Sequence, residues 1–293
     1  MTMSSLKFAQ RPAPAANHVI GAILAAAGRL DPERIERILK FQQQHGALRF
    51  GEAGVRLGLL TEEDIRYALS QQFEHPCLTP GDVSLSPEVL AAFRPRHPFV
   101  EALRGLRSQL LLRRPAEGAA GIRLAITSAC RGEGRSLIAA NLAVLFAQLG
   151  ERVVLIDADL RNPRQHALFR VGDRLGLSTV LSGRAGLEAV TALPALGGLS
   201  LLTAGPSPPN PQELLSRARF RELLEQLNAL FGVVVLDCPA WAEAADLQLI
   251  AARAGSAIVV SQPNAATVAE ATALVRALRE SGAQLLGAVV NRH

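Results

Sequence analysis

Apolar residues are spaced in two different patterns along the chain, and these divide it into two parts. From Val19 to Gln72 they recur about every three to four positions, as in amphipathic helices, and the stretch repeats itself at an offset of 30 residues. The positions in register include Gly21 and Gly51, Gly28 and Gly58, Leu30 and Leu60, and Ile35 and Ile65. The pattern predicts a small all-α tandem-repeat domain, built from two helical hairpins, over residues 18–75.

From about residue 99 onwards, short apolar runs alternate with helical stretches, of which the first, Leu137–Leu149, is expected to be amphipathic. The apolar runs are Ile122–Ser128, Val153–Asp157, Leu199–Thr203, Val233–Asp237, Ala257–Ser261 and Leu285–Val290. Buried parallel strands give continuous apolar runs of this kind, with a helix between successive strands. We therefore predict an α/β domain over residues 99–293, with a mostly parallel sheet covered by helices on both faces.

Two stretches show neither pattern of apolar residues. Residues 1–17 are polar, with scattered alanine and proline, which predicts a disordered leader. The second stretch, residues 76–98, contains five prolines, which interrupt any long helix or strand: Pro76, Pro80, Pro87, Pro95 and Pro98. We expect this second stretch to be a proline-rich linker between the two domains.

The composition narrows the environment in which the protein works. With 293 residues, of which 49% are hydrophobic, the chain can bury a core without disulfides, and Cys77, Cys130 and Cys238 form no CxxC pair of the kind that binds zinc. No apolar run reaches the roughly 18 residues of a membrane-spanning helix. The net charge of +5 comes from basic residues interleaved with acidic ones, which favours a solvated surface over nucleic-acid binding. We expect a cytoplasmic protein without a nucleic-acid partner.

A glycine-containing segment, Thr127–Ser136, lies between the first predicted strand and the first predicted helix of the α/β domain. Glycines at Gly132 and Gly134 let backbone N–H groups approach a phosphate closely, and the following helix directs its positive end at the anion. The Ser136 hydroxyl can ligate magnesium. The segment therefore predicts a phosphate-binding loop; an ordinary glycine turn is the alternative. The remaining candidate nucleotide-binding residues are Glu133, Arg135 and Leu137.

Arg135 stands where such a loop normally has lysine. Lys7 and Lys40 are the only lysines among the 31 basic residues, so the α/β domain has none to offer. A guanidinium keeps the positive charge, but it is longer, planar and forked. If the loop accommodates the arginine, we expect its fork to bridge β- and γ-phosphate oxygens.

Acidic residues end two of the predicted strands. Asp157 and Asp159 follow the second strand, in the segment VLIDADLRNPRQH, and Asp237 ends the strand VVVLD. Ligands bind at the carboxyl ends of parallel strands, where carboxylates can hold magnesium together with nucleotide oxygens. One carboxylate of the first pair could also orient or deprotonate a nucleophile. Taken alone, each motif could simply cap a strand.

In this order, the motifs TSxxxGEGxS, VLIDADLRxPxxH, GLSxVLSG, LLTAGxxPPNPxELL and VVVLDxP resemble those of the bacterial tyrosine kinase family, relatives of the MinD/ParA ATPases. The resemblance covers about residues 101–291 and implies a P-loop NTPase fold that uses ATP and Mg²⁺. It places Arg135 at the phosphate-lysine position and Ser136 at the magnesium position. It also implies a general-base or metal role for Asp157, a supporting catalytic role for Asp159, and a second acidic position, at the metal, for Asp237.

Ahead of the loop, the segment EALRGLR matches the ExxRxxR helix of the same family. The resemblance implies that Glu101, Arg104 and Arg107 mediate assembly of a homo-oligomeric ring. The alternative is an amphipathic surface helix with charge pairs three residues apart.

The second copy of the N-terminal repeat is similar to the N-terminal domains of type II secretion and pilus ATPases, of the MshEN kind. Some of those domains bind cyclic di-GMP, which implies Arg49, Gly51 and Gly58 as candidate contacts. A helical docking module that binds no nucleotide is the alternative. The repeat together with a loop that reads GEGRS resembles the EpsG-like exopolysaccharide kinases.

The resemblance implies a protein-tyrosine kinase that regulates exopolysaccharide chain length or export. The only tyrosine is Tyr67, and the sequence stops at His293 without a tyrosine-rich tail, so we expect the acceptor tyrosine on a partner. The expected partner is an inner-membrane chain-length determinant protein, which would keep the kinase at the membrane periphery. The alternative is a ParA/MinD-like nucleotide-operated switch or scaffold with weak ATPase activity that docks on that protein.

Overall fold

The computed structural model describes residues 20–45, 48–72, 78, 82–113, 121–243 and 245–292. The expected leader, residues 1–17, lies outside the described residues, as do Pro76 and Pro80 of the expected linker. The described chain divides into two compact units between Asp82 and Val83.

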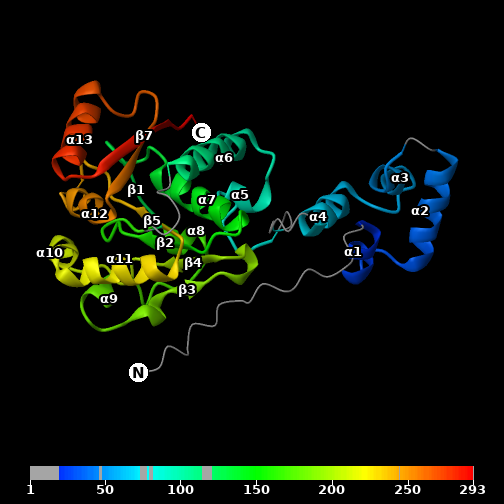
Figure 1. Cartoon of the computed structure of the whole chain (residues 1–293), viewed down its shortest axis with the longest axis horizontal. Coiled ribbons are helices and arrows are strands. Elements are labelled where there is room, and N and C mark those ends of the chain that lie inside the picture. The colour runs from blue at the N-terminus through cyan, green and yellow to red at the C-terminus, as the bar shows by residue number, and fades with distance from the viewer. Residues whose placement is uncertain are drawn as a thin grey trace. The chain divides into compact units, whose positions relative to one another are not determined.

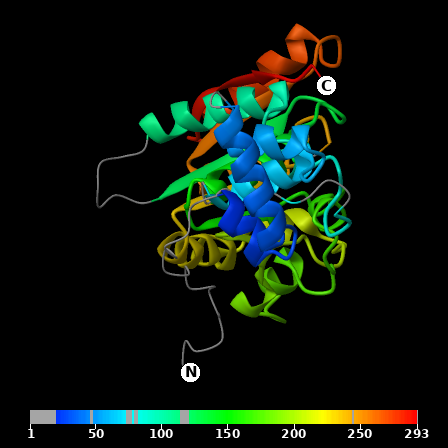
Figure 2. The same ribbon diagram turned by 90° about the vertical axis from the view of Figure 1, so that its right-hand side faces the viewer.

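The smaller unit consists of four short helices, drawn in blue in Figures 1 and 2. They are α1 (Ile20–Ala26), α2 (Pro32–Gln44), α3 (Phe50–Arg56) and α4 (Glu62–Gln72). Helices α3 and α4 therefore begin 30 residues after α1 and α2, as the sequence repeat predicts. Gly28 and Gly58 occupy equivalent turns, at φ values of 67° and 64°, which favour glycine. The core of the unit is formed by Leu24, Leu30, Ile38, Ala53, Leu60 and Ala68.

The larger unit is built on a seven-stranded sheet with the order β3-β4-β2-β5-β1-β6-β7 (Figure 1). The strands are β1 (Ile122–Ser128), β2 (Val153–Asp157), β3 (Thr191–Ala192), β4 (Leu199–Leu202), β5 (Val233–Asp237), β6 (Ser256–Ser261) and β7 (Gln284–Val290). All neighbouring strands are parallel except β3 and β4. Strands β1, β2 and β5 are apolar and buried almost throughout, because helices cover both faces. The predicted fold class is confirmed.

Helix α7 (Arg135–Gln148) packs on β1, β2 and β5, and is in turn covered by α5 (Leu90–Phe93) and α6 (Pro98–Leu112). The other long helices are α11 (Ala218–Leu230), α12 (Asp246–Ala254) and α13 (Val268–Glu280), and the short ones are α8 (Gln165–Leu168), α9 (Leu177–Leu181) and α10 (Pro211–Ser216). The expectation of an amphipathic first helix is wrong: thirteen of the fourteen residues of α7 are buried. The reason is that α5 and α6 cover the side that would otherwise face water.

Part of the expected linker belongs to the larger unit. Val89, Ala91 and Ala92 are buried, and the buried Asn141 of α7 accepts a hydrogen bond from the Ala91 N–H at 2.7 Å. The Asn141 amide also donates to the Glu88 carbonyl at 3.2 Å. Residues 83–98 are therefore structured, and they fix the outer side of the helix that follows the glycine loop.

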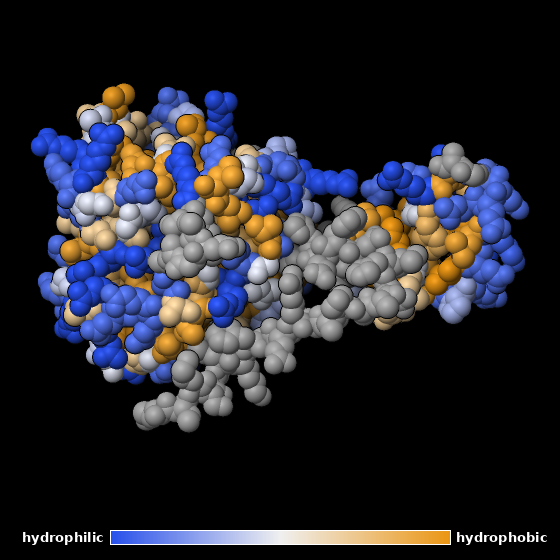
Figure 3. Space-filling view, viewed as in Figure 1, coloured by the Kyte–Doolittle hydropathy of each residue, from blue (hydrophilic) through white to orange (hydrophobic). Residues whose placement is uncertain are grey.

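The surface of the larger unit mixes hydrophobic and hydrophilic residues, as the face in view in Figure 3 shows. Leu112 and Val268 are the most exposed of its large hydrophobic side chains, at 87% and 85%. Among the described residues, no helix is long and apolar enough to cross a membrane.

Candidate active site

The sheet brings three of the candidate segments to one edge. Strand β5 lies between β1 and β2, and its last residue, Asp237, pairs in register with Asp157 of β2 and Ile126 of β1. The strands are parallel, so their carboxyl ends meet on the same side. The glycine loop leaves β1 at that side and leads into α7. The structure thereby collects Arg135, Ser136, Asp157, Asp159 and Asp237, all of them buried.

The glycine loop has a backbone that other residues rarely adopt. Gly132 and Gly134 have φ values of 87° and 91°, and Gly134 forms the N-cap of α7. A Cβ atom on Gly134 would approach Asn291 Nδ2 to 2.1 Å, so a larger residue does not fit there without a shift. Because the first N–H groups of a helix have no partner within the helix, the loop presents donors suited to an anion.

The side chain of Glu133 is bound within the protein. Its carboxylate is fully buried and accepts hydrogen bonds from the Cys130 N–H at 2.7 Å and the Gln262 N–H at 3.2 Å. The Glu133 carbonyl accepts a further bond from Asn291 Nδ2 at 3.0 Å. The Glu133 carboxylate therefore ties the loop to the end of β6, and the Glu133 carbonyl ties it to the end of β7. Leu137, the remaining sequence candidate, lies half-buried in the first turn of α7.

The guanidinium of Arg135 contacts the protein through each of its three nitrogens. Nε donates to the Cys238 carbonyl at 2.7 Å, Nη1 to Ser128 Oγ at 3.3 Å, and Nη2 to Asp159 Oδ2 at 3.0 Å. A carboxylate oxygen of Glu243 lies 3.8 Å from Nη2. The fork thus lies inside the site and is paired with an acid, an arrangement that the sequence did not suggest.

Asp157 and Asp237 are two fully buried carboxyl groups next to each other. Asp157 accepts backbone hydrogen bonds from Gln165 at 2.8 Å, Arg164 at 3.0 Å and Asp159 at 3.3 Å. Burial, and then the neighbouring charge of Asp237, raise the pKa of Asp157 well above its usual range. Burial also raises the pKa of Asp237 to about 6, against hydrogen bonds from Gln165 and Ser136 that favour the charged form.

Sequence reasoning missed Gln165, the first residue of α8. Its side-chain nitrogen Nε2 donates to Asp237 Oδ2 at 2.7 Å and to the Ser136 carbonyl at 3.1 Å. The side chain is fully buried, and its oxygen Oε1 has no hydrogen-bond partner. A glutamine within the segment following Asp157 carries no signal of such contacts, because they depend on how α8 turns back towards β5.

The residues present fit a hydrated magnesium ion bound with a nucleotide. Asp237 Oδ1 and Gln165 Oε1 are buried without partners, and unpaired buried oxygens of this kind call for an ion or ordered water. Among the described residues, no three His, Cys, Asp or Glu side chains form a metal site by themselves. Magnesium takes few carboxylates and completes its shell with water and phosphate oxygens.

The predicted assembly residues on α6 make contacts within the larger unit. Arg104 Nη1 forms an ion pair with Glu101 and donates to the Pro95 carbonyl at 2.7 Å. Arg107 Nη1 donates to the Leu145 carbonyl of α7 at 2.8 Å. Burial, and then the charge of Arg104, lower the pKa of Arg107. The structure does not bring these residues to the glycine loop.

The candidate cyclic di-GMP residues have structural explanations of their own. Gly51 is buried, and a Cβ atom there would lie 2.9 Å from Ile65 Cδ1, so a larger residue would displace the end of the Ile65 side chain. Gly58 forms the turn described above. Arg49 is exposed at the start of α3, where its backbone N–H donates to Glu52 at 3.0 Å.

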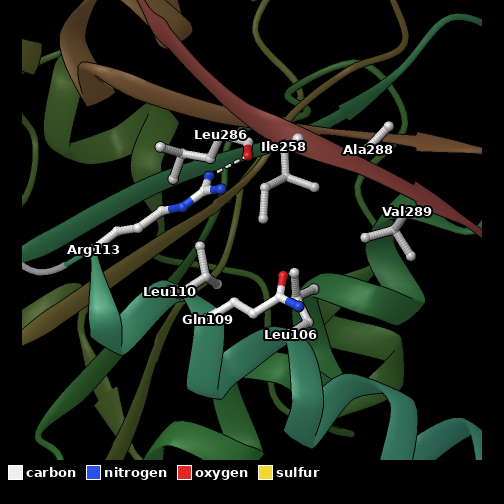
Figure 4. A pocket seen from close by; sticks show the side chains of 9 residues that line it. Leu106, Gln109, Leu110, Arg113, Ile258, Leu286, Ala288 and Val289 are labelled. Carbon is white, nitrogen blue, oxygen red and sulfur yellow. Dashed lines mark hydrogen bonds between the residues drawn. The ribbon is translucent and has the colours of Figure 1, made fainter.

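A separate small pocket lies between α6 and β7 (Figure 4). Leu106, Leu110, Ile258 and Leu286 line it, and the Arg113 guanidinium donates to the Leu286 carbonyl. None of the residues collected at the glycine loop lines this pocket. We assign it no ligand.

Known proteins share both the sequence and the fold of the larger unit. The family model ParA, described as NUBPL iron-transfer P-loop NTPase, matches residues 121–293. Tyrosine-protein kinase YwqD of Bacillus subtilis (strain 168) is 40% identical over 166 residues, which are 57% of this chain and 70% of that protein. Tyrosine-protein kinase etk of Escherichia coli (strain K12) is 35% identical over 202 residues, which are 69% of this chain but 28% of that longer protein.

A solved structure supports the same assignment. The crystal structure of the chimerical protein CapA2B2 matches with a TM-score of 0.66 and 32% sequence identity, over 80% of this chain and 99% of that one. The ParA model matches the part of the chain that holds the glycine loop and the acidic strand ends. The chain therefore belongs to the bacterial tyrosine kinase family, whose kinase domain is a ParA-like P-loop NTPase.

Proposed function

We propose that this protein is an ATP-dependent protein-tyrosine kinase that regulates exopolysaccharide chain length or export by phosphorylating tyrosine on a partner protein. The observation that carries the proposal is the meeting of a positive-φ glycine loop with three buried acids at one edge of the sheet. The names of the relatives YwqD and etk support the reaction type.

Each residue of the site has a proposed task. The backbone of Gly132 and Gly134 binds phosphate, while Ser136, Asp157 and Asp237 hold magnesium. Magnesium-ATP supplies a γ-phosphoryl group whose charge the metal partly neutralises. Asp157 orients the acceptor hydroxyl and takes its proton, for which a raised pKa is favourable, because a base works best when its pKa is near the working pH.

Arg135 stabilises the negative charge of the transferred group in this proposal. In the structure its Nη2 is paired with Asp159 at 3.0 Å, so phosphate oxygens would compete with that carboxylate for the guanidinium. Asp159 in turn is held by the backbone N–H of Asn162 at 2.9 Å. Asp159 thereby holds the Arg135 guanidinium in position until the more highly charged phosphate displaces the Asp159 carboxylate.

The proposed partner is an inner-membrane chain-length determinant protein of polysaccharide export. The single tyrosine of the sequence, Tyr67, lies in the small helical unit and packs under the Arg29 guanidinium at 4.4 Å, which supports an acceptor on another chain. We further propose that the kinase is cytoplasmic, stays at the inner membrane through this partner, and forms a homo-oligomer through Glu101, Arg104 and Arg107 of α6.

The proposed domain organisation is a leader over residues 1–17, a regulatory tandem repeat over 18–75, and a kinase domain that begins at residue 83, because residues 83–98 of the expected linker 76–98 belong to the larger unit. The MshEN-like reading of the repeat is part of this proposal, with cyclic di-GMP bound at Arg49. The exposed guanidinium of Arg49 supports it, because arginine can stack on guanine and pair with phosphate. Titration of the full chain with cyclic di-GMP, against Arg49→Ala, tests it. If no binding is seen at high micromolar concentrations of cyclic di-GMP, the alternative holds, in which the repeat is a docking module that binds no nucleotide.

Phosphoamino-acid analysis tests the proposed kinase activity. The purified protein is incubated with radiolabelled ATP, magnesium and the membrane partner, and we expect labelled phosphotyrosine on the partner. ATP binding and slow hydrolysis without phosphotyrosine would instead indicate the ParA/MinD-like switch, in which nucleotide occupancy alone controls docking.

A further inference from the structure

We propose that Gln165 is a positioning residue of the magnesium site, which holds Ser136, Asp157 and Asp237 in place and offers its side-chain oxygen to the hydration shell of the metal. The inference rests on the proposed function, since the three residues are the metal ligands of that proposal. It adds a residue that stands at a variable position of the segment VLIDADLRNPRQH.

Gln165 contacts each of the three proposed ligands. Its side-chain Nε2 donates to Asp237 Oδ2 at 2.7 Å and to the carbonyl of Ser136 at 3.1 Å, while its backbone N–H donates to Asp157 Oδ2 at 2.8 Å. The three ligands come from α7, β2 and β5, which the chain separates by many residues. One buried residue thus links all three ligands, two through its side chain and the third through its backbone N–H.

Two oxygen atoms remain without partners around this contact. Gln165 Oε1 and Asp237 Oδ1 are both buried and accept no hydrogen bond. Leaving a buried acceptor without a hydrogen bond is unfavourable, so two such oxygens on residues that contact each other indicate a group that supplies donors. Water molecules bound to magnesium are such donors, and magnesium in proteins usually keeps several of them.

The chemistry of the amide explains why glutamine suits this position. An amide donates through nitrogen and accepts through oxygen, so it can face a carboxylate with one atom and bound water with the other. A glutamate would add a third acid beside Asp157 and Asp237. A leucine would fill the same space but leave Asp237 Oδ2 with one donor fewer, and an asparagine would be one methylene shorter.

The test compares ATP binding with and without magnesium in the full chain. Calorimetry is done in excess Mg²⁺ and again in EDTA, for wild type, Gln165→Leu and Gln165→Asn. Outer residues that orient metal ligands typically contribute about 10- to 100-fold to metal affinity. We therefore expect both variants to lose about tenfold or more of the affinity gained with Mg²⁺, while their affinity in EDTA stays within about twofold of wild type.

Gln148→Leu is the matched control. Gln148 is also a buried glutamine, on α7, but its Nε2 donates to the Ala91 carbonyl at 2.9 Å, away from the acids. We expect its Mg²⁺ gain to equal that of wild type. Circular dichroism and thermal melting check folding, and Gln165→Asn keeps the measurement decisive if the leucine variant does not fold.

The outcomes separate the inference from the proposed function. If Gln165→Asn or Gln165→Leu keeps the full Mg²⁺ gain of wild type, the inference is wrong while the magnesium site stands. If wild type itself binds ATP equally well in Mg²⁺ and in EDTA, the proposed metal site is wrong, and the inference falls with it.

Discussion

The Arg135 guanidinium donates to the Asp159 carboxylate at 3.0 Å, and both side chains are almost excluded from solvent. Because a guanidinium is a planar fork, it can reach this carboxylate, the Cys238 carbonyl and the Ser128 hydroxyl at once. An ammonium is a point charge on a shorter stem and would not meet all three. The surroundings of the loop therefore suit arginine in particular, which argues against a damaged site.

We expect Arg135→Lys to transfer phosphate no faster than wild type, because the network around the fork would be lost. Arg135→Ala should be slower by about a hundredfold or more, the usual effect of removing one well-placed charge contact to the transition state. Single-turnover transfer from labelled ATP measures both variants. A lysine variant several-fold faster than wild type would contradict accommodation of the arginine and favour a nucleotide-sensing scaffold.

Gly134→Val should abolish ATP binding measured by calorimetry. The glycine has a φ of 91°, which a β-branched residue rarely adopts, and an added Cβ atom would meet Asn291 Nδ2 at 2.1 Å, so we expect the loop to lose its phosphate-binding shape. Gly172→Ala is the control, since an added Cβ atom there meets no atom within 4 Å. Unchanged affinity in a folded Gly134→Val protein would overturn the phosphate-loop assignment.

The buried carboxyl group of Asp237 should make the stability of the nucleotide-free protein depend on pH. Burial raises its pKa from 3.8 to about 6, so between these values the folded state binds more protons than the unfolded state. The resulting stabilisation is complete below about pH 4 and is lost as the pH rises through about 6. Urea denaturation of wild type should therefore show a free energy of unfolding that falls between about pH 4 and 6.

Asp237→Asn tests this directly, because it removes the titrating group but keeps its shape. We expect the variant to be more stable than wild type at pH 7.5, by on the order of 1 to 3 kcal/mol. The difference in free energy of unfolding between the two proteins should be smaller at pH 5. The same dependence on pH in both proteins would mean that Asp237 does not titrate in this range.

The strands of the larger unit are predictable from the sequence because burial on both faces leaves continuous apolar runs. The predicted run Val233–Asp237 and strand β5 have the same bounds, and Val153–Asp157 coincides with β2. The offset of 30 residues likewise reappears in the starts of α1 and α3. The sequence pattern did not predict that helix α7 is buried on both sides. Its outer side is covered by α5 and α6, within residues 90–112, and no local pattern indicates that these residues pack on it.

The motifs identify which residues meet at the sheet edge, but not how their side chains pair. Parallel strands ending in acids place Asp157 next to Asp237, and that follows from the order of the strands. The pairing of Arg135 with Asp159 and the place of Gln165 depend on turns after the strands. Glu133 shows the same limit. Its position suggests a ligand contact, whereas its buried carboxylate accepts hydrogen bonds from the N–H groups of Cys130 and Gln262.

The most direct test of the account measures phosphotyrosine formed on the membrane partner by wild type and by Asp157→Asn, with ATP affinity determined for both. Asp157 is proposed to act on the acceptor hydroxyl and the metal more than on nucleotide anchoring. We predict labelled phosphotyrosine with wild type, a loss of about a hundredfold or more with Asp157→Asn, and measurable ATP binding in both. Equal phosphotyrosine from the two proteins, or none from wild type that binds ATP, would contradict the proposed kinase site.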